Sequence, residues 1–283
     1  MISNRQLQET GFKVAALAAT AVVIGSLAAI LGTIVVKGCH ALNWSIITQV
    51  PKGDYYLGGK GGIANAIVGS IYLGAGATFL ALAIGLPTVL YLRTYAREGR
   101  FAGLIRGLLD VLWGVPSIVF GAFGFTLMVY LGLRASLLAG IITVAMFELP
   151  IMIRAIDEVV RMVPHELEEA AYALGSTRFE TAVGVVARQA LPGIVTGSLL
   201  AFGRGIGDAA SVLFTAGFTD RIPHSLSDPA ATLPLSVFFQ LGTPFEEVHQ
   251  RAYAAALVLV ILVLFVSIVS RILSARLSRF TIK

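Results

Sequence analysis

The chain has 283 residues, of which 57% are hydrophobic and only 13% are charged, and its formal net charge is +5. A soluble domain normally carries about 25% charged residues, so this composition excludes an ordinary water-soluble enzyme and a disordered chain. A transmembrane β-barrel is disfavoured because its strands alternate apolar and polar residues, whereas apolar residues here run without interruption. We therefore expect an all-α membrane protein that contacts a lipid bilayer and does not bind nucleic acid.

Six apolar segments predict transmembrane helices, because about 20 residues are needed to cross the hydrocarbon core. Together they predict one transmembrane domain over residues 1–283, with spans at about 14–36, 63–92, 111–133, 135–153, 191–218 and 252–270. The first segment is longer than the apolar core of a secretory signal peptide, which has about 7 to 15 residues. We therefore expect it to be retained as a membrane helix.

The lysines and arginines predict the orientation of these helices. Most of the 21 basic residues lie near the two ends of the chain or in alternate loops, at residues 93–106 and 154–188. Such residues gather on the cytoplasmic side of a membrane. Both termini and the loop 154–189 are therefore expected in the cytoplasm.

The cytoplasmic loop 154–189 has a helical pattern of its own. Acidic residues follow Pro164, which favours a helix start because the N-terminal end of a helix dipole is positive. Gly175 then marks the end of this helix, and Thr177 stands three residues before Glu180, the spacing of a capping box. We predict a helix, a glycine turn and a second helix at the membrane surface.

Two charged residues of the fifth segment are the main candidates for a transport site. Arg204 and Asp208 are four residues apart, so on one helix they would share a face that Ser211 continues. A charge inside the bilayer costs roughly 2.5 to 3.5 kcal/mol, so such charges usually face a pathway or a partner. One hypothesis is that the guanidinium of Arg204 binds a passing anion, while Asp208 positions it and limits its affinity. The alternative is a buried ion pair that only fixes helix packing.

The remaining polar residues favour structural roles. Glu148, in the fourth segment, is expected to face the bundle or to stabilise a kink at Pro150, and Asp110 is expected near the positive end of the third helix. The four histidines lie outside the spans and the chain has one cysteine, so no catalytic residue, metal site or cofactor is expected. The sequence also lacks the motif G-x-x-x-x-G-K-[ST], so ATP hydrolysis would have to occur in a partner chain.

A motif in the cytoplasmic loop resembles the E-A-A signature of the membrane subunits of bacterial ABC importers. It consists of Glu169-Ala170-Ala171, then Gly175, and further on Leu191-Pro192. The resemblance implies the type I permease fold of these importers, with a cytoplasmic coupling helix at Glu169, Ala170, Ala171 and Gly175 that docks into the ATPase. This chain has Ala187-Arg188 where importers commonly have another Leu-Pro pair, so we expect a continuous helix into the fifth span.

Four further stretches resemble the permeases of phosphate importers, namely residues 62–70, 114–121, 205–217 and 231–244. The resemblance implies a phosphate permease subunit whose partners are a second related permease (PstC-like), an ABC ATPase homodimer (PstB-like) and an external phosphate-binding protein (PstS-like). It also shows one departure, since the family tends to place Glu where this chain has Asp208.

The sequence leaves three alternatives to a phosphate permease. A permease for sulfate, molybdate or tungstate is the main alternative, because these oxyanions are tetrahedral like phosphate and an arginine would bind all four in the same way. A secondary transporter or channel acting alone would be expected to show repeated halves or several midplane charges. An intramembrane enzyme would need a catalytic group of residues near the midplane, and the sequence offers none.

Overall fold

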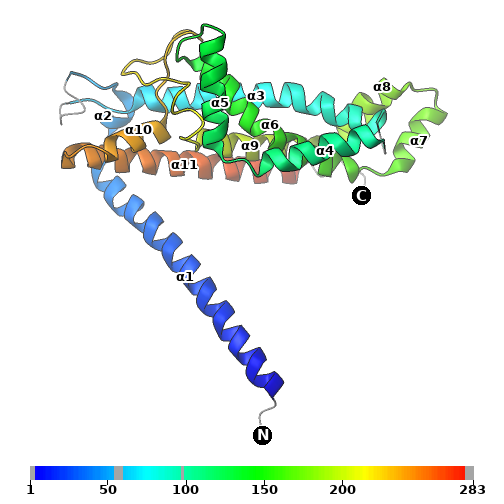
Figure 1. Ribbon diagram of the computed structural model, residues 1–283, viewed down its shortest axis with the longest axis horizontal. Helices are drawn as coiled ribbons and strands as arrows, with labels where there is room; N and C mark the ends of the chain where they lie inside the picture. The colour runs from blue at the N-terminus through cyan, green and yellow to red at the C-terminus, as the bar shows by residue number, and fades with distance from the viewer. Residues whose placement is uncertain (1–3, 54–59, 97–98, 278–283) are drawn as a thin grey trace.

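The computed structural model describes residues 4–53, 60–96 and 99–277, and every regular element in these ranges is helical (Figure 1). The elements, in chain order, are α1 (Asn4–Ala41), α2 (Trp44–Thr48), α3 (Ala64–Thr94), α4 (Arg100–Trp113), α5 (Ser117–Tyr130), α6 (Leu137–Arg161), α7 (His165–Ala173), α8 (Arg178–Thr181), the π-helical turn η2 (Ala182–Val186), α9 (Ala187–Ile206), α10 (Leu233–Leu241) and α11 (Glu246–Leu277).

The predicted all-α membrane fold is confirmed for the described ranges. Five helices are long and apolar enough to cross a bilayer: Gln8–Ala41, Ala64–Thr94, Leu137–Arg161, Arg178–Ile206 and Glu246–Leu277. A sixth crossing is present if α4 and α5, which meet at a bend of 103°, are counted as one broken span. The chain is therefore a multi-pass membrane protein.

The predicted span at 111–133 is not one continuous helix. Helix α4 ends at Trp113, Gly114 follows as its C-cap, and α5 begins only after Pro116. Proline has no backbone N–H and disfavours helical geometry in the residue before it, so the chain turns here although every side chain is apolar or small. Asp110 was expected near the positive, N-terminal end of a helix. It lies instead near the C-terminal end of α4.

The fifth predicted span, 191–218, is also shorter than expected. Helix α9 ends at Ile206, and the residues from Gly207 to Ala216 form turns. The side chain of Asp208 accepts a hydrogen bond of 2.8 Å from the backbone N–H of Ser211, and such local bonds compete with helix continuation. The expected common helix face of Arg204, Asp208 and Ser211 therefore does not exist.

Three helices, α3, α6 and α9, form the centre of the molecule. Their contacts are close because small residues stand where the backbones approach, as is usual between membrane helices. A Cβ atom added at Gly85 of α3 would lie 3.3 Å from Ile153 of α6, and one added at Gly197 of α9 would lie 3.1 Å from Ala155. This trio connects the two ends of the molecule as one packed unit.

Helix α1 extends away from this centre (Figure 1). It meets the rest of the chain near its C-terminal end, where Gly38 is buried against Leu257 of α11. Residues 11–33 are exposed and almost entirely apolar, a surface that suits lipid or another membrane subunit.

The helices at one end of the molecule agree closely with the sequence prediction. Helices α7 and α8 lie at the end opposite to α2 and α10 (Figure 1). Gly175 between them has a φ of +88°, a conformation that favours glycine. Both hydrogen bonds of the capping box between Thr177 and Glu180 are present, and the helix runs on from Arg178 to Ile206 as expected.

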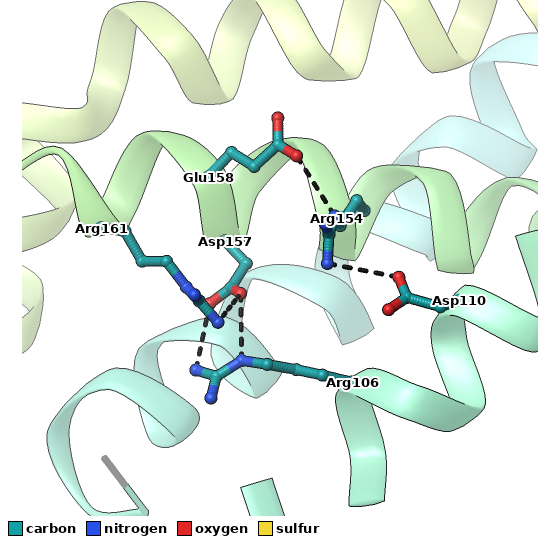
Figure 2. Close-up of polar contacts among 6 residues, drawn as sticks. All are labelled: Arg106, Asp110, Arg154, Asp157, Glu158 and Arg161. Atoms are coloured by element: carbon teal, nitrogen blue, oxygen red, sulfur yellow. Dashed lines mark hydrogen bonds and ion pairs between the residues drawn. The ribbon is translucent and has the colours of Figure 1, made fainter. Parts of the chain in front are cut away.

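Charged contacts hold the amphipathic helix α4 against α6 (Figure 2). Asp157 of α6 contacts Arg106 of α4 at 3.1 Å and Arg161 of its own helix at 3.0 Å. Nearer the bend, Arg154 of α6 contacts Asp110 of α4 at 3.2 Å. The position of α4, and with it the start of α5, therefore depends on ion pairs as well as apolar packing.

Candidate functional site

The first candidate site is the E-A-A motif, which the structure places on α7 and the turn after it. Glu169 and Ala170 are exposed, while Ala171 is buried against the rest of the chain. Beside Gly175, the side chain of Leu174 is 88% exposed. Large apolar side chains exposed at a polar end of a membrane protein indicate a contact with another protein.

One buried ion pair ties α7 to the central helices. Arg93, at the end of α3, donates to Glu168 from Nη2 at 2.7 Å and from Nε at 3.0 Å. The same guanidinium donates to the carbonyl of Val163 at 3.2 Å. Glu168 is only 3% exposed. Sequence reasoning had used Glu168 only as part of an acidic helix start and had missed its partner, because the two residues are far apart along the chain.

Replacing Glu168 by Ala is expected to lower the free energy of unfolding by about 3 kcal/mol or more, because it leaves the guanidinium of Arg93 without its buried partner. The thermal unfolding midpoint of the purified chain measures this change. Glu166→Ala is the matched control, because Glu166 is on the same helix but exposed, and its effect should stay within about 0.5 kcal/mol. Equal midpoints for the two variants would show that the ion pair does not hold α7.

The second candidate site is a polar cavity of about 410 Å³ beside the bend between α4 and α5. Its lining residues are Trp113, Gly114, Val115, Pro116, Ser117, Phe147, Arg204, Gly207 and Asp208. The structure thus brings the two predicted charges together with the stretch 114–121 that resembled phosphate permeases. Ser211 is not among the lining residues and is fully buried.

Arg204 and Asp208 line the same cavity without forming the ion pair that one hypothesis expected. Within the ranges described, Arg204 contacts the ring of Phe147, with Cζ 5.2 Å from the ring centroid, and no ion pair joins it to Asp208. The side chain of Asp208 instead accepts a hydrogen bond from the backbone N–H of Ser211. The guanidinium donors of Arg204 are therefore available at the cavity, since a ring face uses none of them.

The N-terminus of α5 adds a second feature that favours anions. The N–H of Val119 donates to the carbonyl of Pro116 at 3.0 Å, and Pro116 at the N-cap supplies no capping side chain, so the N–H groups of Ser117 and Ile118 are the ones that point to a ligand. These groups and the helix dipole attract negative charge. Ser117 brings a hydroxyl to the same place. A small oxyanion could be held between this helix end and Arg204, with the carboxylate of Asp208 opposing tight binding.

Glu148 is the neighbour in sequence of Phe147, which lines this cavity. It is fully buried in α6, and its Oε2 accepts a hydrogen bond of 2.9 Å from Thr78 of α3. Its Oε1 faces Gly205 of α9, where any Cβ atom would collide with it, and has no hydrogen-bond partner among the described residues. Glu148 thus faces the bundle interior, as expected, and joins all three central helices next to Arg204.

The described residues contain no group of three or more His, Cys, Asp or Glu side chains that could hold a metal ion.

Comparisons with known proteins show the family to which the chain belongs. Residues 77–279 match the family described as "Binding-protein-dependent transport system inner membrane component". A phosphate transport system permease protein PstA of Haemophilus influenzae is 34% identical over 243 residues, which cover 86% of this chain and 85% of that protein. PstA 1 of Mycobacterium tuberculosis is 36% identical over 231 residues, covering 79% of this chain and 76% of that protein.

A solved structure shows the same fold. The inward-facing MetNI methionine ABC transporter contains a chain that superposes with a TM-score of 0.61. The superposition covers 76% of this chain and 95% of that chain, at 18% sequence identity. The predicted ABC importer permease fold is thus confirmed. With residues 77–279 matching the family and relatives above 30% identity over most of its length, the chain belongs to the binding-protein-dependent transport system inner-membrane components.

Proposed function

We propose that the chain is a membrane permease subunit of an ATP-driven importer of inorganic phosphate. The observation that carries this proposal is the cavity in which Arg204 and the uncapped N-terminus of α5 face the same space. A phosphate ion has the charge and the several oxygen acceptors that a guanidinium and backbone N–H groups require. The names of the PstA relatives support phosphate as the substrate.

The translocation pathway is shared with a second, related permease, and ATP is hydrolysed by a separate ATPase dimer. The exposed apolar side chains around Leu174 and the motif on α7 support docking of the ATPase at this end. An external phosphate-binding protein delivers the substrate at the opposite end. In this arrangement both termini lie in the cytoplasm and the protein resides in the bacterial inner membrane.

The ion pair between Arg93 and Glu168 gives a physical route from ATP hydrolysis to the pathway. A force on α7 acts on α3 through this contact. Helix α3 is packed tightly on α6 and α9, which carry Phe147, Glu148 and Arg204. Packed helices of this kind move as units because their interfaces resist continuous deformation.

The glycine turn after α7 provides a test of the docking surface. Gly175→Val should reduce both co-purification of the ATPase and ATP-driven uptake, because a β-branched residue at positive φ costs about 1–2 kcal/mol and distorts the turn. Gly175→Asn should retain both ATPase co-purification and uptake, since Asn tolerates this conformation. Loss of ATPase binding in neither variant, or in both equally, would contradict the proposed role of the turn geometry.

Uptake of labelled phosphate into vesicles that contain the chain, its partner permease, the ATPase and the binding protein tests the function as a whole. The proposal predicts uptake that requires both ATP and the binding protein. Uptake of sulfate, molybdate or tungstate in place of phosphate would retain the ATP-driven mechanism and overturn the substrate. Phosphate flux in the absence of the ATPase would overturn the importer itself.

A further inference from the structure

A second, larger cavity lies at the end of the molecule that carries α7. It has a volume of about 920 Å³ and lies between the ends of α3, α4, α6 and α7. Three arginines contribute its charged lining, Arg93, Arg106 and Arg161, and His165 lies beside them. The arginines contact two carboxylates behind the cavity, Glu168 and Asp157, which are almost completely buried.

The carboxylates that contact the arginines of this cavity do not neutralise all of their positive charge. Arg106 and Arg161 both contact the same oxygen, Oδ2 of Asp157, at 3.1 and 3.0 Å (Figure 2). Asp157 is 5% exposed at its side chain, whereas Arg161 is 50% exposed. One carboxylate thus serves two guanidinium groups, each of which has five N–H donors. The spare donors and the excess charge are available to an anion in the cavity.

We propose that this cavity binds a phosphate group on the cytoplasmic side and that its occupation slows the ATP-driven cycle. The ligand is either inorganic phosphate or the phosphate of an anionic lipid headgroup, because both present a tetrahedral group with several acceptor oxygens. Arginine forks bind such groups by paired hydrogen bonds. The exposed apolar residues Phe101, Leu104 and Leu108 on α4 would allow a lipid to approach from the bilayer.

The position of the cavity explains how an occupant acts on transport. Arg93 lines the cavity and also holds Glu168 of α7, so an anion that engages Arg93 weakens the contact between α7 and α3. Arg106 lies on α4, whose C-terminal end leads directly into the bend beside Arg204. The ligand therefore reaches both the ATPase-docking helix and the substrate pathway. This regulatory role rests on the proposed function, whereas the binding site itself rests only on the residues that line it.

Arg161→Gln tests the proposal with little disturbance of the fold, because it leaves Asp157 paired one-to-one with Arg106. Arg100→Gln is the matched control, since Arg100 begins the same helix α4 but is exposed and outside the described lining. The assembled complex in nanodiscs of neutral lipid is given saturating phosphate-loaded binding protein. Its ATPase rate is then measured against millimolar phosphate at constant ionic strength, with chloride as the balancing anion.

If inorganic phosphate is the ligand, the ATPase rate of the parent and of Arg100→Gln falls as phosphate rises. In Arg161→Gln the half-inhibitory concentration rises by about tenfold or more, because one charge-assisted contact is lost. If a lipid is the ligand, phosphate has no effect in neutral nanodiscs. Phosphatidylglycerol then lowers the rate of the parent and of Arg100→Gln, and Arg161→Gln is resistant.

The proposal is overturned if neither phosphate nor phosphatidylglycerol changes the rate, or if Arg161→Gln and Arg100→Gln respond alike. Broadening of the ³¹P NMR signal of phosphate by the complex, without binding protein or ATP, measures occupation of the site independently of transport. Broadening that Arg161→Gln removes, in a complex that imports no phosphate, would retain the site and reject the proposed function. Full uptake with no difference in broadening or inhibition between the variants would retain the proposed function and reject the site.

Discussion

Replacement of Arg204 by Gln or Lys is expected to abolish most phosphate uptake while the complex still assembles. The Gln variant loses the charge, and the Lys variant retains it but loses the planar fork that can hold two oxygens at once. Charge-assisted hydrogen bonds contribute about 1.5–3 kcal/mol each, so uptake should fall by about tenfold to a hundredfold. Initial rates of ATP-driven uptake of labelled phosphate in vesicles provide the measurement.

The structure offers a close control for this experiment. Arg188 lies in the first turn of the same helix α9, is exposed, and is not among the described lining residues of the cavity. Arg188→Gln makes the same change of charge, and uptake should remain near that of the parent. Normal uptake in Arg204→Lys would exclude a required fork-shaped contact, and normal uptake in Arg204→Gln would exclude any role of this charge in the pathway.

Gly121→Ala is expected to have the second large effect, through the shape of the site. Gly121 on α5 packs against backbone, and an added Cβ would lie 2.7 Å from the carbonyl oxygen of Ala210 and 3.0 Å from that of Ser211. Backbone atoms cannot move aside as a side chain can, so we expect a loss of about 1–3 kcal/mol in stability from overpacking. The shift of α5 away from the turns after α9 should also separate its N-terminus from Arg204 and reduce uptake.

Gly107→Ala is the control for this change, because a Cβ at Gly107 of α4 would meet nothing within 4 Å. Its thermal unfolding midpoint should equal or exceed that of the parent, since Ala favours the helix by up to about 1 kcal/mol over Gly. A Gly121→Ala variant with the same midpoint and the same uptake as Gly107→Ala would show that the contact between α5 and the turns is not needed.

The sequence predicted the elements whose signals are local. Uninterrupted apolar stretches located α3, α6 and α11, since length and hydropathy alone distinguish a membrane helix. The capping box at Thr177 and the glycine stop at Gly175 placed α7 and α8 correctly, because each signal depends on residues within one turn.

Sequence reasoning missed two ends of helices and one contact between distant segments. Hydropathy predicted one span over 111–133 because Gly114 and Pro116 carry no charge and lower the average only slightly, although they were the available signal for a break. The end of α9 at Ile206 could not be predicted from hydropathy, because apolar residues continue into the turns that follow. The partnership of Arg93 with Glu168 joins two helices that are far apart in the chain, and no local pattern encodes it.

The most direct test of the anion pathway is the reactivity of a cysteine placed in the cavity. Ser117→Cys is introduced after replacement of Cys39, the single cysteine of the chain, by Ser. The assembled complex is then labelled with an anionic and a cationic thiosulfonate during turnover, with and without phosphate. Thr126→Cys, on an exposed part of α5 outside the described lining, is the control. The account predicts that the anionic reagent modifies residue 117 faster than the cationic one and that phosphate slows this reaction but not the reaction at residue 126. Preference for the cationic reagent, or equal rates with and without phosphate, would contradict an anion pathway between α5 and Arg204.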